Sequence, residues 1–148
     1  MSRAHDPWLV AGGVLSAGAA LLHLGVIAGG PDWYRFFGAG EEMARLAERG
    51  SPMPPLVTLA IATLLAVWAA YAFSGAGLIR RLPLIRLALV LISSIYLLRG
   101  LVLVPILIIR SGAVDDFTLW SSLIVLAYGV AYAVGTARVW PSLRKQAS

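Results

Sequence analysis

Four long apolar runs constrain the fold of this chain more than any other feature of its sequence. They cover residues 8–29, 55–75, 84–109 and 117–138, and each has the roughly 20 residues that a membrane-spanning helix needs. With 59% hydrophobic and 13% charged residues, the chain is too apolar for an ordinary soluble domain. Because these runs take up most of the sequence, we predict an all-α fold, an integral membrane four-helix bundle that forms a single membrane domain over residues 1–148.

One arginine lies deep in the third apolar run. Arg99 stands within the segment SSIYLLRGLVLVP, residues 93–105. A charged side chain at bilayer depth costs about 2.5–3.5 kcal/mol on insertion scales, so such residues usually face protein or water and mark a functional site. Two interpretations of Arg99 are open: a structural arginine that forms an ion pair or caps carbonyls, and an arginine that lines a site. Pro105 cannot donate to the carbonyl of Leu101, which predicts a kink or local unwinding there.

The connection between the first and second runs, residues 32–55, is the only long polar connection in the sequence. It begins with an aromatic cluster suited to the lipid headgroup layer, formed by Trp33, Tyr34, Phe36 and Phe37. Residues 40–49 then predict a short amphipathic helix that lies along the membrane surface or caps the bundle. Within this helix Glu41 precedes Arg45 by one turn, a spacing that stabilises helices.

The distribution of basic residues predicts that both termini are cytoplasmic, because loops rich in Lys and Arg stay on that side. The side of the termini collects Arg3, Arg80, Arg81, Arg86, Arg138, Arg144 and Lys145. The other side collects most of the acidic residues together with Arg35, Arg45, Arg49 and Arg110. A cleaved signal peptide is the alternative to an uncleaved first helix, which we favour because the first apolar run continues without a polar cleavage region.

Helix rise places several polar side chains at a similar depth. His23 and Arg99 fall about 22 Å from the cytoplasmic edge at about 1.5 Å per residue, while Thr58, Ser121 and Ser122 fall within about 8 Å of the outer edge. We therefore expect a polar layer near the extracytoplasmic face. Because helical side chains lean towards the N-terminus of their helix, Arg99 is predicted to point towards the bilayer centre.

The apolar runs contain no acidic residue, so a charge partner for Arg99 must come from a loop or from a bound anion. The loop candidates are Asp32, Glu41, Glu42, Asp115 and Asp116. We predict a ligand-binding site drawn from Arg99, His23, Glu41, Glu42, Asp32, Tyr96, Ser121, Ser122 and Thr58. No residue is assigned a catalytic role. His23 has a second interpretation, a packing histidine hydrogen-bonded to a serine or a carbonyl.

Several classes of function are excluded or disfavoured. The chain has no cysteine, which excludes thiol redox catalysis and cysteine-ligated metal. His5 and His23 lie at opposite ends of one predicted helix, so a single chain cannot sandwich a haem between them. We predict no metal site and no cofactor. The arginines are spread between apolar runs and form no basic helix face, so a nucleic-acid partner is not expected.

The layout resembles a known group of membrane proteins. With its four predicted spans and the segment LLHLGVIAGGPDWYRFFGAGE at the end of the first one, the chain resembles the DoxX-like group of small bacterial four-helix inner-membrane proteins. The segments PDWYRFFGAGEEMARL and YLLRG are also similar to segments of other bacterial membrane proteins. The resemblance implies a multi-pass protein of the bacterial inner (plasma) membrane. It implies no activity, and no residue's role is carried over from it.

Three functions fit these features. In the first, a lipid, quinone or isoprenoid binds with its polar head near Arg99 and His23 and its tail between helices. If that site were catalytic, His23 would be the general acid or base and Arg99 would stabilise negative charge. In the second, the chain is a structural or accessory subunit that holds a partner membrane protein. In the third, it is a transporter that works as a homo-oligomer, with His23 as its titratable group.

Overall fold

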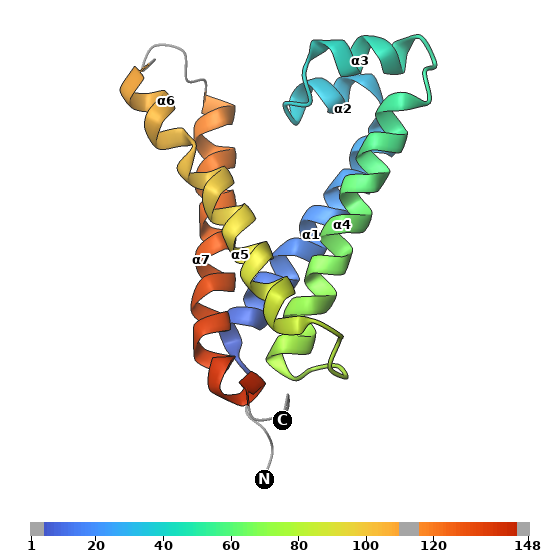
Figure 1. Ribbon diagram of the computed structural model, residues 1–148. Coiled ribbons are helices and arrows are strands. Elements are labelled where there is room, and N and C mark those ends of the chain that lie inside the picture. The colour runs from blue at the N-terminus through green and yellow to red at the C-terminus, as the bar shows by residue number, and fades with distance from the viewer. Residues whose placement is uncertain (1–4, 110–115, 145–148) are drawn as a thin grey trace. The chain divides into compact units, whose positions relative to one another are not determined.

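The computed structural model describes residues 5–109 and 116–144, which form helices joined by turns, without a strand among them (Figure 1). The helices are α1 (Pro7–Gly29), α2 (Pro31–Phe36), α3 (Glu41–Glu48), α4 (Met53–Ala76), α5 (Ile85–Leu101), α6 (Leu103–Ile109) and α7 (Asp116–Arg144). Four stretches are long and apolar enough to cross a membrane: Pro7–Gly29, Met53–Ala76, Ile85–Ile106 and Asp116–Leu143. The prediction of an all-helical chain with four apolar spans is therefore confirmed for the described residues.

The third apolar run differs from the prediction of one helix over residues 84–109. Helix α5 ends at Leu101, α6 begins at Leu103, and Val102 forms the turn between them. Pro105 is the third residue of α6, a first-turn position where a missing N–H costs little. The interruption therefore lies where the carbonyl of Leu101 has no donor four residues later, as expected from the proline.

Two further differences concern the short helices and the end of α7. Residues 31–36, predicted only as an aromatic cluster, form the helix α2, which begins with a proline after Gly30 at φ 71°. Helix α7 continues past the predicted end at residue 138 and includes Pro141. Leu143 is buried in this last turn, and burial of an apolar side chain offsets the loss of one backbone hydrogen bond.

The chain divides into two compact units whose boundaries fall within α1 and α4. Unit 1 combines Met1–Leu15 with Trp68–Ser148, and so contains α5, α6 and α7 together with one end of α1 and of α4. Unit 2 is the continuous segment Ser16–Val67, which contains α2 and α3. The prediction of a single membrane domain stays a prediction.

In unit 1, α5 and α7 run antiparallel and approach each other through glycine (Figure 1). A Cβ placed on Gly100 would lie 2.7 Å from the Cα of Leu126, and a Cβ on Gly129 would lie 2.8 Å from the backbone nitrogen of Leu97. Real Cβ atoms do not approach backbone atoms so closely, so both positions require glycine. Each step forward along α5 is matched by one step back along α7, which fixes the register of this pair.

The ends of α1 and α4 that belong to unit 1 pack on the same pair of helices. Leu9 is fully buried and lies against Gly75 and Gly135. The hydroxyl of Tyr132 donates to the carbonyl of Trp68 at 3.0 Å. The Tyr96 ring contacts the rings of Trp68, Tyr128 and Tyr132 at centroid distances of 4.9–5.4 Å. The core of unit 1 is thus a cluster of aromatic rings bordered by small residues.

In unit 2, the short helices α2 and α3 form a helical hairpin. Tyr34 is 2% exposed and packs with Val26 and Ala44 in a small apolar core. The indole of Trp33 lies directly over Gly29, and a side chain at position 29 would collide with the ring. These contacts explain why six residues form a helix that is too short to be stable alone.

Candidate functional site

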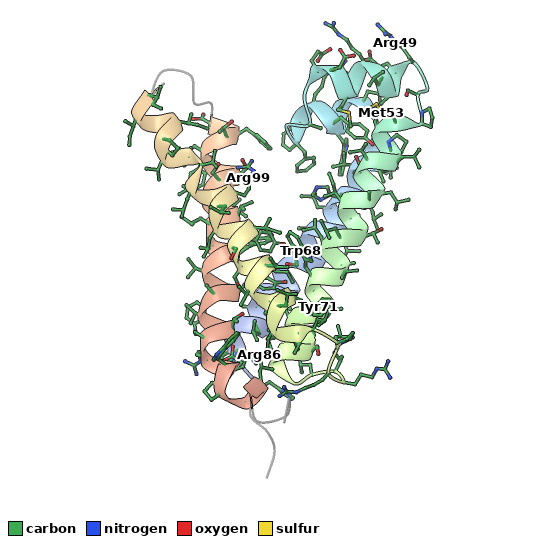
Figure 2. All side chains as sticks on the ribbon, in the orientation of Figure 1. Arg49, Met53, Trp68, Tyr71, Arg86 and Arg99 are labelled. Atoms are coloured by element: carbon green, nitrogen blue, oxygen red, sulfur yellow. The ribbon has the colours of Figure 1, made fainter. Side chains whose placement is uncertain are left out.

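Arg99 forms one side-chain hydrogen bond among the described residues of unit 1. Its Nη1 donates to the hydroxyl of Ser122 on α7 at 3.3 Å. Ser122 is 1% exposed, whereas Arg99 is exposed on α5 (Figure 2). The next residue, Gly100, lies against the α7 backbone at Leu126. The contact between the two helices therefore sets the position from which the arginine side chain extends.

The prediction that Arg99 points towards the N-terminal end of its helix is wrong. Ser122 lies one turn closer to the start of α7 than Leu126, which faces Gly100. In an antiparallel pair, that direction runs towards the C-terminal end of α5. The lean of helical side chains concerns the Cα–Cβ bond, and the long flexible stem of arginine allows its head to extend the other way.

The other predicted site residues of unit 1 have partners of their own or lie apart from the arginine contact. The hydroxyl of Ser121 donates to the carbonyl of Thr118 at 3.2 Å. Tyr96 belongs to the buried aromatic cluster. Asp116 is the exposed first residue of α7, and Asp115 lies outside the described residues. Within unit 1, the structure brings together Arg99 and Ser122.

His23 lies in unit 2, where its Nδ1 is 2.7 Å from the carbonyl oxygen of Ala19. A carbonyl only accepts hydrogen bonds, so this contact requires a proton on Nδ1. In the neutral ring, Nε2 is then the nitrogen that can accept a proton or a hydrogen bond. This geometry agrees with the interpretation of a packing histidine bonded to a carbonyl, and it leaves one ring nitrogen for other chemistry.

Thr58 also lies in the interior of unit 2. Its hydroxyl lies 3.4 Å from the hydroxyl of Tyr34, and both side chains are buried. The contact joins α4 to α2 at the small apolar core. Thr58 therefore has a structural partner, and its predicted role in ligand binding stays a prediction.

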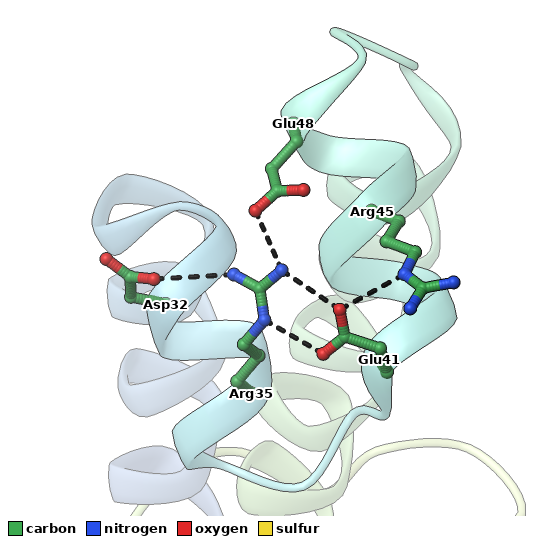
Figure 3. Close-up of polar contacts among 5 residues, drawn as sticks. All are labelled: Asp32, Arg35, Glu41, Arg45 and Glu48. Carbon is green, nitrogen blue, oxygen red and sulfur yellow. Dashed lines mark hydrogen bonds and ion pairs between the residues drawn. The ribbon is translucent and has the colours of Figure 1, made fainter.

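Two of the predicted acidic residues of the first connection, Asp32 and Glu41, pair with Arg35, and so does Glu48, which was not predicted (Figure 3). The guanidinium of Arg35 pairs with Glu41 at 2.9 Å, with Glu48 at 2.7 Å and with Asp32 at 3.4 Å. Arg45 also pairs with Glu41, at 3.2 Å and one turn away. Glu42 is exposed in the first turn of α3.

These contacts change the proton affinity of the groups involved. Hydrogen bonds from Arg35 hold the pKa of the Glu41 carboxyl below its ordinary value of 4.5. The same bonds raise the pKa of the Arg35 guanidinium further above its already high value. Glu41 therefore stays ionised, and it pairs with both Arg35 and Arg45 in the hairpin.

Two arginine contacts of unit 1 were not predicted. One Asp6 carboxylate oxygen accepts the backbone N–H groups of Trp8 and Leu9 at 3.1 and 3.0 Å, and the other accepts Nε of Arg138 at 3.0 Å. An aspartate directly before Pro7 is a helix-start signature, so the cap could have been found in the sequence. The Arg138 contact joins residues far apart in the chain and has no local signal.

The second contact that was not predicted lies at the start of α5. The guanidinium carbon of Arg86 lies 4.4 Å from the centroid of the Trp140 ring on α7. Such stacking holds a cation on an aromatic face. Figure 2 shows Arg86 and Arg99 towards opposite ends of α5.

The two groups of polar contacts have different chemical capacities. Arg35 is surrounded by carboxylates, whereas Arg99 has donors to offer beyond the one that Ser122 accepts. Arg99 is therefore the group of this pair that suits an anion. Comparison of the chain with protein-family models, with curated proteins and with solved structures gave no significant match.

Proposed function

We propose that this multi-pass membrane protein binds an amphiphilic or lipid-like molecule whose anionic head contacts Arg99. The observation that carries the proposal is the surroundings of Arg99. It is exposed within an apolar span, and the described residues of unit 1 give it a serine hydroxyl but no carboxylate. A guanidinium has five N–H donors in a fixed fork, so most of these N–H groups are available to a ligand.

The proposed head and tail positions follow from the residues around this guanidinium. A phosphate or carboxylate accepts two parallel N–H groups from an arginine. The tail lies along the exposed apolar surface of α5 and α6, which includes Leu98, Leu101, Val102 and Val104. Binding from the lipid side requires no water-filled path through the protein.

The proposal includes an orientation. The end of unit 1 that holds Arg80, Arg81, Arg86 and Arg138 faces the cytoplasm of a bacterial inner membrane, because basic residues favour that side. Both termini are then cytoplasmic, and Arg99 lies nearer the outer face. Of the basic residues behind this inference, Arg3 and Lys145 lie outside the described residues. A reporter fused after Ser148 that is active only in the periplasm would contradict the orientation.

Arg99→Leu tests the binding site, with Arg81→Leu as a control that removes one exposed loop arginine. Native mass spectrometry of the purified chain is expected to show one bound anionic lipid fewer in Arg99→Leu and an unchanged number in Arg81→Leu. Arg99→Lys keeps the charge but loses the two parallel donors, so it is expected to retain the lipid more weakly.

A structural role for Arg99 predicts a different result. If Arg99→Leu and Ser122→Ala lower the thermal stability by similar amounts while the bound lipid is retained, Arg99 locks α5 to α7 and the proposal is wrong. Loss of the lipid with little change in stability supports it.

A further inference from the structure

We propose a second anion site in unit 1, in which Arg86 and Thr136 hold the phosphate group of a ligand at the end opposite Arg99. This inference goes beyond the proposed function and does not depend on it. Arg99 follows Arg86 by thirteen positions on α5, which corresponds to about 20 Å of helix. A ligand head on one arginine therefore cannot contact the other.

Arg86 is held in place without an anionic partner among the described residues. Its guanidinium stacks on the ring of Trp140 at 4.4 Å, and its Nε is buried without a hydrogen-bond acceptor there. Leaving a buried charged donor unpaired is costly, and native proteins satisfy nearly all such groups. Stacking orients the guanidinium but does not satisfy this N–H group.

A second buried polar atom lies on α7, one turn before Trp140. Thr136 is 6% exposed, and its hydroxyl has no hydrogen-bond partner among the described residues. Thr136 precedes Trp140 by four residues, so the two side chains lie on the same face of the helix. A hydroxyl and a guanidinium N–H both donate to phosphate oxygens, and this pair of donors favours an anion over a cation or a neutral ligand.

The charges of this end also favour an anion. Arg80 and Arg81 belong to the loop that leads into α5. The hydroxyl of Ser74 stabilises this loop, because it donates to the Arg80 carbonyl and accepts the N–H of Leu82. The one described carboxylate here, on Asp6, already accepts Arg138 and two backbone N–H groups. The site is therefore positive and has no acidic side chain left for Arg86.

The position of the site suits a phospholipid headgroup. Helix α4 ends at Ala76 and α5 begins at Ile85, so Arg86 lies at the boundary of two apolar spans, where headgroup phosphates lie. Free phosphate offers the same oxygens to the two donors. The experiment therefore includes both sources of phosphate.

The test measures the thermal stability and bound lipids of the full chain in phosphatidylcholine nanodiscs, with added phosphatidylglycerol or with inorganic phosphate. Phosphatidylglycerol is expected to raise the melting temperature of the wild type. Thr136→Val keeps the side-chain shape and removes the hydroxyl, so it is expected to need at least about tenfold more phosphatidylglycerol for half of that rise. In pure phosphatidylcholine, Thr136→Val is expected to be as stable as the wild type or more stable, because it removes an unpaired buried hydroxyl.

Arg86→Gln and Arg81→Gln remove the same charge from neighbouring positions and separate a specific site from a general effect of charge. The proposal expects Arg86→Gln to abolish the response and Arg81→Gln to retain it. Equal losses in both variants, or an unchanged response in Thr136→Val, would overturn the proposal. A response to inorganic phosphate alone that depends on Thr136 supports the site and identifies free phosphate as the ligand.

Discussion

Among the described residues, Arg35 on α2 pairs with three carboxylates, whereas Arg99 on α5 donates to one serine hydroxyl. The helix pairs that hold these arginines also differ. Helices α2 and α3 pack through the large buried ring of Tyr34, whereas α5 and α7 approach so closely that Gly100 and Gly129 leave no space for a side chain.

This difference separates an arginine that is paired with carboxylates of the protein from an arginine whose described contact in unit 1 is a neutral hydroxyl. In the α2–α3 hairpin, ion pairs and an aromatic core act together, and Arg35 has little capacity left. In the α5–α7 pair, the backbones approach closely at Gly100 and Gly129, and Arg99 adds one hydrogen bond to Ser122. Most N–H groups of its guanidinium have no acceptor among the described residues of unit 1.

The largest expected effect comes from Tyr34, the centre of the small core of unit 2. Tyr34→Ala is expected to cost the α2–α3 hairpin about 3–5 kcal/mol, as for other large buried rings. Tyr34→Phe is the control, because it keeps the ring and loses only the 3.4 Å contact with Thr58. Peptide-resolved hydrogen exchange should show rapid exchange of residues 31–48 in the alanine variant. Equal protection in both variants would show that charges alone hold the hairpin.

An intermediate effect is expected at Gly129 in the α5–α7 pair. Gly129→Ala places a Cβ against the backbone of Leu97, which cannot move aside as a flexible side chain can, so a cost of about 1–3 kcal/mol is expected. Gly18→Ala is the matched control, because no atom lies within 4 Å of the added Cβ. The melting temperatures of the two variants in detergent provide the comparison. If both variants melted at the same temperature, close backbone contact would not be what holds α5 to α7.

The smallest effect concerns the charges around Arg35. Because the folded pKa of Glu41 is lowered, its contribution to stability is present above the ordinary value of 4.5 and is lost as the pH falls through the lower folded value. Hydrogen exchange of α3 should therefore accelerate modestly below about pH 4.5. Arg35→Gln should reduce this pH dependence, whereas Arg49→Gln, one turn beyond Arg45, should not. High salt should weaken the effect, since the groups are exposed.

The four apolar spans could be predicted because their length and composition are local properties of the sequence. The interruption near Leu101 also followed from one residue, Pro105. Helix α2 could not be predicted in the same way, because the contact of Trp33 with Gly29 and the burial of Tyr34 stabilise it, and both depend on tertiary packing. The predicted end at residue 138 followed the apolar composition of the fourth run, whereas α7 continues to Arg144 and buries Leu143.

The candidate site was predictable in part. Arg99 stood out because a charge in an apolar run is visible in any sequence, and helix rise placed Ser122 in the outer part of the membrane near it. The partners of Arg35 and the stacking of Arg86 on Trp140 depend on how helices pair, which no spacing along the chain reveals. The direction of Arg99 was wrong because the lean of Cα–Cβ bonds does not fix where a long side chain ends.

The positions of Arg86 and Arg99 along α5 have a consequence for the depth at which each can meet a lipid. If Arg86 marks one headgroup layer, Arg99 branches from α5 about 20 Å away, whereas an undisturbed hydrocarbon core is about 30 Å thick. Arg99 therefore lies inside the span and not at its outer edge, because the apolar stretch Ile85–Ile106 continues beyond it. A polar head bound to Arg99 would thus lie deeper than the outer headgroup layer.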